Sequence, residues 1–253
     1  MINIKDGDFV QEYLSRLVQI INLSQNRPLN DMVYEGLRKA IIQGVIPVGE
    51  RLNEKVLSDY MNISRTPIRN AIKKLTDEDL VEYIPKYGVV VKRVTVADAE
   101  EIYEIRIALE TMATIAAMNR MTPENHQEMQ ALLKKTEEDN EKGEVKKVIQ
   151  YFTDFNAMIY RFSRMQRLEN VVGNMLEYVA RFRDISLYDD ERRRLALKEH
   201  GLIYRGMQTK DEELISLIVN EHLNHSKEFV LRGILRSEEN MRDDLKDLYR
   251  RME

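Results

Sequence analysis

The sequence predicts a mainly α-helical protein in which one short β-hairpin interrupts the helices of the first third. Apolar residues recur at three- and four-residue spacing along most of the chain, which is the period of an amphipathic helix. The stretches "VEYIP" and "VVVKRV" are instead rich in β-branched residues and flank the turn "KYG", a pattern typical of two antiparallel strands. No strand pattern occurs beyond residue 94. We therefore expect a mixed first part followed by an all-helical second part.

Composition narrows the class of protein. A length of 253 residues suits two domains, and a hydrophobic fraction of 43% is enough for ordinary cores. The absence of cysteine excludes disulfides and thiolate metal sites. No window reaches the roughly 18 uncharged apolar residues of a membrane span, because Glu110 interrupts the best candidate, and the N-terminus lacks the order of a secretory signal. We expect a cytoplasmic protein without a membrane partner.

Three parts follow from the pattern. Residues 1–28 form an extension with an amphipathic helix over 8–21, which docks on the body of the protein or on a second subunit. Residues 29–94 hold a helix, "LNDMVYEGLRKAIIQG", with Asn30 as its cap and Gly44 at its end. A turn and short strand, "GVIPVGERL", then precede two helices that only "NI" separates, and the hairpin follows. Residues 95–253 are helical throughout.

The order helix, tight turn, helix and hairpin is that of a winged helix-turn-helix, whose second helix lies in the DNA major groove. Residues 29–94 carry 11 basic and 9 acidic side chains, a net charge of +2, while the whole chain carries −4. Arg65, Arg69 and Lys73 recur every four residues along the second helix. The apolar residues that would seat this helix lie on a neighbouring face: Ile68, Ile72 and Leu75. An isolated basic triplet is usually only a solvated face, but the flanking helix and hairpin favour DNA.

The beginning of this helix and the hairpin turn suit a nucleic acid. Ser64 is expected to cap the helix, so that its first N–H groups face phosphate. An Arg fork can pair with both acceptors of a guanine edge. Lys86 and Tyr87 with Gly88 form the tip of the predicted wing.

The stretch from "VYEGLRKAIIQG" to "YGVVV" resembles the DNA-binding domain of the GntR family of bacterial transcription regulators. It follows the family pattern "I..G...PG..L.E..LA..L.VSR.PVR.AL..L..EGL......G..V" over about residues 30 to 94, departing at Val48, Ser58 and Asp79. By position, the resemblance implies DNA contacts from Lys55, Arg65, Thr66, Arg69 and the wing from Lys86 to Gly88.

The second part is expected to form helices over 96–119, 122–141, 146–164, 166–186, 189–208, 211–235 and 238–252. Thr122 with Pro123, and Ser237 with Glu238, read as helix starts. The segments "IYEIRIALETMAT", "FNAMIYRFSRMQRL", "KEHGLIYRGM" and "NEHLNHSKE" resemble the FCD type of effector domain of the FadR-like branch. The resemblance implies a helical bundle that binds a small carboxylate, often around a metal held by one Asp and three His.

The positions of that metal site fall here on Phe152, Asn156, His200 and His222, so that the aspartate and one histidine are missing. Two imidazoles and one amide make a poor zinc or nickel site without a carboxylate. Asp154 is two residues from Asn156, on another helix face. Two interpretations stay open: a divalent metal completed by the ligand or by His225, or a metal-free pocket with hydrogen-bonding histidines.

Arg106 lies among apolar residues and should point inward, where a guanidinium needs an anion. Glu110, one turn later, or a bound carboxylate could supply it. Arg181 and Arg183 are weaker candidates for binding the ligand.

We therefore predict a homodimeric transcription regulator, usually a repressor in this family, that binds a pseudo-palindromic duplex operator and responds to a small carboxylate effector through Arg106, Asn156, His200 and His222. The alternatives are a helical metalloenzyme that uses His200 and His222, or a DNA-binding protein without a ligand. Against an enzyme, the chain has no Gly-rich phosphate loop, no G-x-S-x-G and no H-E-x-x-H motif.

Overall fold

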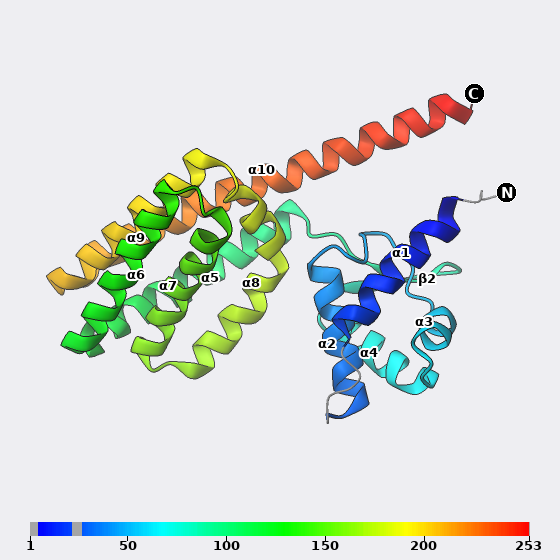
Figure 1. The fold of residues 1–253 in the computed structure, drawn as a ribbon, viewed down its shortest axis with the longest axis horizontal. Coiled ribbons are helices and arrows are strands. Elements are labelled where there is room, and N and C mark those ends of the chain that lie inside the picture. Colours follow the sequence, from blue (N-terminus) through cyan, green and yellow to red (C-terminus); the bar gives the residue numbers. More distant parts are fainter. Residues whose placement is uncertain (1–4, 22–26, 253) are drawn as a thin grey trace. The chain divides into compact units, whose positions relative to one another are not determined.

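The structure is a computed structural model that describes residues 5–21 and 27–252. The chain divides into two compact units, residues 1–93 and 94–253. Within the described residues, the first unit combines helices with one hairpin and the second consists of helices (Figure 1). The predicted fold class, mainly helical with an early hairpin, is therefore confirmed.

The elements of the first unit are α1 (Lys5–Ile20), α2 (Leu29–Ile42), α3 (Glu54–Met61), α4 (Arg65–Asp77), β1 (Val81–Ile84) and β2 (Gly88–Val91). The tight turn before α4 has a local cause. The side chain of Asn53 caps α3, and Asn62 ends α3 in the left-handed region with φ 53°. Asparagine tolerates that conformation, so the chain can reverse within a few residues and begin α4 at once.

Helix α1 packs on α2 within this unit. Leu17 is completely buried, and a Cβ added at Gly36 of α2 would overlap the side chain of Ile21. The hydroxyl of Tyr13 donates a hydrogen bond of 3.2 Å to Glu50. The sequence left open whether this helix docks on the body of the protein or on a second subunit. In the structure, α1 packs on the winged helix of its own chain.

Two local expectations for this unit were wrong. Asn30 lies inside the first turn of α2, because Pro28, whose backbone is extended (φ −56°, ψ 128°), occupies the N-cap position. The strand expected in "GVIPVGERL" reduces to a single bridge between Arg51 and Val90. Pro47 has no N–H for a ladder, and Gly49 turns the chain with φ 80°, so a longer strand cannot form.

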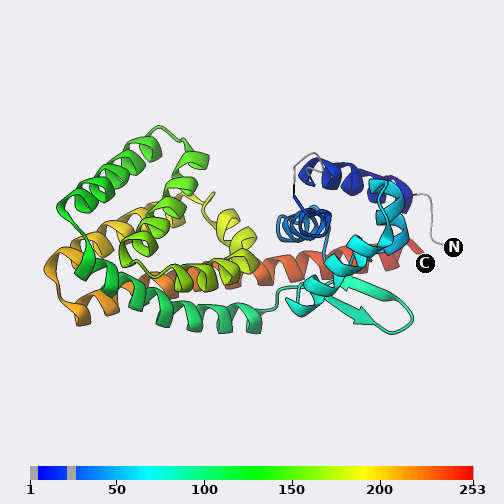
Figure 2. The ribbon, with the colours of Figure 1, turned by 90° about the horizontal axis from the view of Figure 1, so that it is seen from below.

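The hairpin consists of two adjacent antiparallel strands (Figure 2). Its register is regular, with Val81 opposite Val91 and Ile84 opposite Gly88. At its tip, Lys86 and Gly88 have φ values of 67° and 111°. The value at Gly88 suits only glycine, which explains that residue at the end of the turn.

The second unit consists of α5 (Val96–Arg120), α6 (Pro123–Glu141), α7 (Val145–Ser163), α8 (Gln166–Ser186), α9 (Asp190–Thr209) and α10 (Glu212–Met252). Thr122 forms a capping box ahead of Pro123, as the sequence predicted. The expected start at Ser237 was wrong, because α10 runs through it as one helix (Figure 1). Ser237 is exposed and followed by two glutamates, so its weak preference for a cap yields to the continuing hydrogen-bond ladder.

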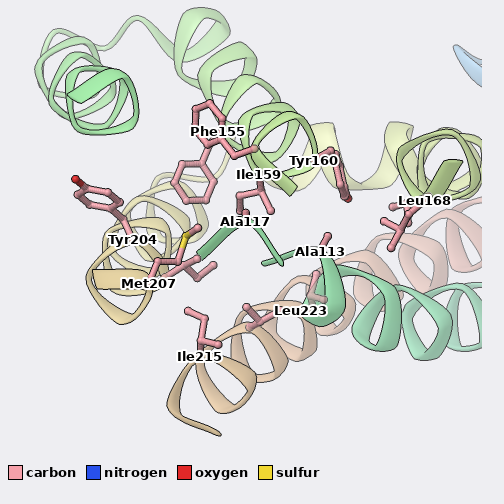
Figure 3. Close-up of a cluster of buried hydrophobic side chains, with 14 of the residues drawn as sticks. Ala113, Ala117, Phe155, Ile159, Tyr160, Leu168, Tyr204, Met207, Ile215 and Leu223 are labelled. Carbon is pink, nitrogen blue, oxygen red and sulfur yellow. The ribbon is translucent and has the colours of Figure 1, made fainter. Parts of the chain in front are cut away.

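Helix α5 lies at the centre of this unit and packs against α7, α8 and α10. Its buried side chains include Tyr103. Ala113 and Ala117 of the same helix join residues of α7 and α10 such as Phe155 and Leu223 in one hydrophobic core (Figure 3). Among the described residues, no helix has the length and apolar character needed to cross a membrane.

Candidate DNA-binding surface and buried cavity

Helix α4 separates an apolar face from a basic one. Its buried residues are Pro67, Ile68, Ala71, Ile72 and Leu75. The exposed side carries Arg65, Thr66, Arg69 and Lys73. Ser64 occupies the N-cap position, but its hydroxyl makes no capping bond, contrary to expectation. The first N–H groups of α4 and this hydroxyl are therefore left for an outside acceptor such as phosphate.

Arg69 differs from the other cations on this surface because Glu54 holds it. Its Nη2 lies 2.9 Å from Oε2 of Glu54, and its Nε lies 3.2 Å from each oxygen. This carboxylate raises the pKa of the exposed Arg69. In the described part of the chain, no ion pair involves Lys55, Arg65 or Lys73. The sequence did not reveal this pair, since its partners stand 15 residues apart on different helices.

The wing has a second cation that sequence reasoning missed. Lys86 and Tyr87 at the tip are exposed, as expected of a wing. The guanidinium of Arg51 lies 5.7 Å from the centre of the Tyr87 ring, and its Nε lies 3.1 Å from the place of a Cβ at Gly88. The sequence predicted a short strand that includes Arg51. The face of a strand on which a side chain lies depends on how the strand pairs, which the sequence does not show.

In the second unit, the structure brings Arg106, Asn156, His200 and His222 to one cavity between α5, α7, α9 and α10. The remaining lining residues are Ile149, Phe152, Thr153, Arg183, Leu187, Arg192, Ala196 and Ser226. The cavity has a volume of about 30 Å³, which is room for about one water molecule. Its described lining contains three arginines and no aspartate or glutamate.

His200 is buried between aromatic rings. Its ring stacks on Phe155 with centres 4.3 Å apart and meets Phe152 and His222 edge-on at 4.9 and 5.0 Å. Its Nδ1 is buried without a hydrogen-bond partner in the described structure. Burial, together with the charges of His222 and Arg192, holds the pKa of His200 well below its ordinary value. The imidazole is therefore neutral near pH 7.

Glu199 is the central residue that the sequence did not reveal. Its Oε2 lies 2.7 Å from Nδ1 of His222 and 3.3 Å from Nη1 of Arg192, and its Oε1 lies 2.6 Å from Nδ1 of His225. Burial favours the protonated acid, but the bonds from His222, His225 and Arg192 outweigh it and lower the pKa of Glu199. An ionised carboxylate only accepts, so both histidines carry a proton on Nδ1.

Of the two partners expected for Arg106, Glu110 and a bound carboxylate, the structure shows Glu110, and one nitrogen of the guanidinium still has no partner among the described residues. Its Nε donates a hydrogen bond of 2.7 Å to Glu110, and its guanidinium lies 4.5 Å from the centre of the Tyr103 ring. Its Nη1 is buried without a partner among the described residues. Burial opposes the charge, but the attraction of Glu110 holds the pKa of Arg106 above its ordinary value. Arg183 lines the same cavity and pairs with Asp184, while the side chain of Arg181 lies outside the described ones.

The donor set does not fit a divalent metal. Phe152 stands buried at the position of the expected aspartate. Both oxygens of Glu199 already bind histidines and Arg192. Within the part of the chain that the structure describes, no three His, Asp or Glu residues are placed to hold a metal ion. The predicted set of Asn156, His200 and His222 therefore lacks the carboxylate that zinc or nickel would need.

Comparisons with known proteins agree with both units. Residues 29–91 match the model of bacterial regulatory proteins of the gntR family, and residues 101–225 match the FCD domain. YdhC of Bacillus subtilis, an uncharacterised helix-turn-helix transcriptional regulator, is 28% identical over 219 residues, covering 86% of this chain and 98% of YdhC. The transcriptional repressor RspR of Escherichia coli is 24% identical over 208 residues, covering 82% and 91%. The solved structure of E. coli McbR/YncC shares the fold, with a TM-score of 0.61, 24% identity and coverage of 81% and 98%.

Proposed function

Since the chain belongs to the GntR family of bacterial transcriptional regulators with an FCD domain, and is thus a DNA-binding regulator and not an enzyme, we propose that it is a repressor whose DNA affinity depends on a small carboxylate in the FCD cavity. RspR is a repressor, and repression is the mode that we extend to this chain. The observation that carries the effector part is the buried, unpartnered Nη1 of Arg106 in a cavity whose described lining holds no acid.

The DNA surface consists of the exposed side of α4, the first turn of α3 and the wing. Arg65 and Thr66 in the first turn of α4 read base edges or phosphate, and Lys55, Lys73 and Lys86 contact the backbone. One recognition helix contacts only a few base pairs. Two copies of the chain on a pseudo-palindromic site therefore supply the specificity that one cannot.

The effector acts by linkage. The cavity is lined by residues of α5, α7, α8, α9 and α10, so that a ligand bound there favours the arrangement of these helices that it contacts best. In the arrangement that the ligand favours, the dimer binds the operator more weakly. The ligand then lowers the affinity for DNA, and DNA lowers the affinity for the ligand, by the same free energy. A bound carboxylate then relieves repression.

The DNA-binding part is tested by fluorescence anisotropy. Labelled fragments from the chain's own promoter region are titrated at low ionic strength, and sedimentation gives the number of chains per duplex. We expect saturable binding of two chains, weakened by Arg65→Ala and untouched by Lys134→Ala, a change of an exposed cation in the other unit. Equal affinity for the operator and for an unrelated duplex would contradict the proposal.

The effector part is tested on the same fragments with the same assay. A panel of small carboxylates is added to the preformed complex, and the release of DNA is followed. His200→Ala should keep the basal DNA affinity and lose the response, because its ring packs against the cavity but lies outside the DNA-binding unit. An intact response in His200→Ala would place the effector elsewhere.

A further inference from the structure

Three buried polar atoms that lack a hydrogen-bond partner among the described residues belong to side chains that line one small cavity. They are Nη1 of Arg106, Nε of Arg192 and Nδ1 of His200. Folded proteins rarely leave buried donors unpaired. Two further such atoms, Nδ1 of His126 and the hydroxyl of Tyr160, belong to residues outside this lining. The gathering of the other three around one cavity indicates that a ligand supplies their missing partners.

The two arginines are held from behind by carboxylates that do not line the cavity. Glu110 binds Nε of Arg106 at 2.7 Å, and Glu199 binds Nη1 of Arg192 at 3.3 Å. The guanidinium of Arg192 also lies 5.2 Å from the centre of the Phe229 ring. These contacts hold both guanidinium groups and leave one buried nitrogen of each, Nη1 of Arg106 and Nε of Arg192, without a partner among the described residues. Such donors can bind an oxyanion through charge-assisted hydrogen bonds.

The charge of the lining points the same way. Arg106, Arg183 and Arg192 contribute positive charge, and the described lining includes no carboxylate. Each of these arginines pairs with a carboxylate outside the lining, so the cavity presents N–H donors and no anionic oxygen, which favours an anion over a divalent cation. Phe152, at the place where a metal site would need an aspartate, instead makes a T-shaped ring contact with His200.

We propose that this cavity binds a compact oxyanion, a carboxylate or a phosphate, directly between the guanidinium groups of Arg106 and Arg192 and without a metal ion. The proposal rests on the proposed function and specifies its ligand chemistry. Arg106 comes from α5 and Arg192 from α9, so that one anion ties two helices of the unit together. Nδ1 of His200, also on α9, supplies a third hydrogen bond.

Binding requires a local movement. A volume of about 30 Å³ suits one water molecule, and a carboxylate or phosphate is larger. Phe152 is the bulky apolar residue of the lining beside His200, and it packs in a small separate cluster with Val148, Leu187 and Ala196. We expect a movement of this ring to enlarge the cavity, since the cluster to which it belongs is separate from the main core.

The test is calorimetric titration of the whole chain after treatment with a chelating resin, with metal content measured by mass spectrometry. The probes are inorganic phosphate, succinate and citrate, which separate tetrahedral from planar oxyanions. We expect at least one probe to bind the metal-free chain. Arg192→Lys keeps the charge but removes the unpaired Nε, and should weaken that binding about tenfold or more. Arg194→Lys, an exposed neighbour paired with Asp190, is the matched control and should bind as the parent does.

The outcomes separate this proposal from the proposed function. If a probe binds only after zinc or nickel is added, or if Arg192→Lys binds it as tightly as the parent, direct recognition by the arginines is wrong and the effector site stands. If no probe binds with or without metal, the cavity is not an oxyanion site and both statements about the effector fall. DNA affinity, measured separately, decides the rest of the proposed function. Thermal melting confirms that each variant is folded.

A reverse experiment starts from the missing ligands. The double variant Phe152→Asp with Asn156→His restores the residue types that the FCD resemblance implies. We expect it to retain about one zinc or nickel per chain after dialysis, whereas the parent retains none. A parent chain that keeps one metal ion per chain under the same conditions would overturn the proposal.

Discussion

Glu199 offers the sharpest test of how the cavity is held together, through the change Glu199→Gln. In the parent, one buried carboxylate accepts hydrogen bonds from His222, His225 and Arg192. The amide that replaces it has one acceptor oxygen and no charge, so at least one histidine loses its acceptor. The guanidinium of Arg192 loses its buried counter-charge, although its ring contact with Phe229 remains.

The expected cost follows from these contacts. Removing one partner of a buried ion pair costs about 3–5 kcal/mol. The contact to Arg192 is long, at 3.3 Å, and the amide oxygen still accepts one bond, so we expect the lower end, about 3 kcal/mol. For a domain of this size each kcal/mol corresponds to roughly 2–4 °C, so the midpoint of thermal unfolding should fall by about 6–12 °C.

The assay is urea and thermal unfolding of a double-mutant cycle made from Glu199→Gln and Arg192→Gln. Because the double variant removes both charges, it should be more stable than the sum of the single changes predicts, by about 2 kcal/mol. Glu191→Gln, an exposed carboxylate at the beginning of the same helix, is the control.

Two results would refute this reasoning. One is a loss of stability in Glu199→Gln no larger than that in the exposed control Glu191→Gln. The other is additivity of the two buried changes to within about 0.5 kcal/mol, which would mean that Arg192 does not depend on this carboxylate.

Three further predictions concern the first unit. Arg65→Ala should lower operator affinity by about 1–3 kcal/mol, measured by anisotropy, because an arginine fork in the groove loses its bonds to a base edge. Glu54→Gln should raise DNA affinity by up to about 1 kcal/mol at low salt, because it releases Arg69 from an exposed ion pair. Gly36→Ala should destabilise the unit to urea by about 1–3 kcal/mol, because the new methyl group overlaps Ile21 and pushes α1 away from α2.

Matched variants decide each of these cases. Lys134→Ala removes an exposed cation of the other unit, and a loss of operator affinity equal to that of Arg65→Ala would deny a role in the groove. An unchanged salt dependence of DNA binding in Glu54→Gln would show that the pair does not compete with DNA. Gly201→Ala adds a methyl group that meets only the far end of one side chain, at 3.9 Å, so it should be neutral; an equally mild effect of Gly36→Ala would mean that α1 is loosely held.

Much of the architecture could be predicted from the sequence because it depends on neighbours along the chain. The apolar and basic faces of α4 follow from a spacing of three to four residues. The start of α6 follows from Thr122 and Pro123, and the hairpin from β-branched runs around a turn. Such patterns failed where the local preference was weak, as at Ser237, where serine fits a cap and an exposed helix position almost equally well.

The sequence alone determined that this chain carries a winged helix followed by a helical bundle, and that Arg106, His200 and His222 face inward, since helical period depends only on spacing. Only the tertiary structure decided what those groups meet. Glu199 joins residues 23 and 26 positions away, and Arg192 reaches the cavity wall, because the rotation and offset of packed helices set these contacts. No single helix pattern contains that information, since it belongs to the packing of one helix against another.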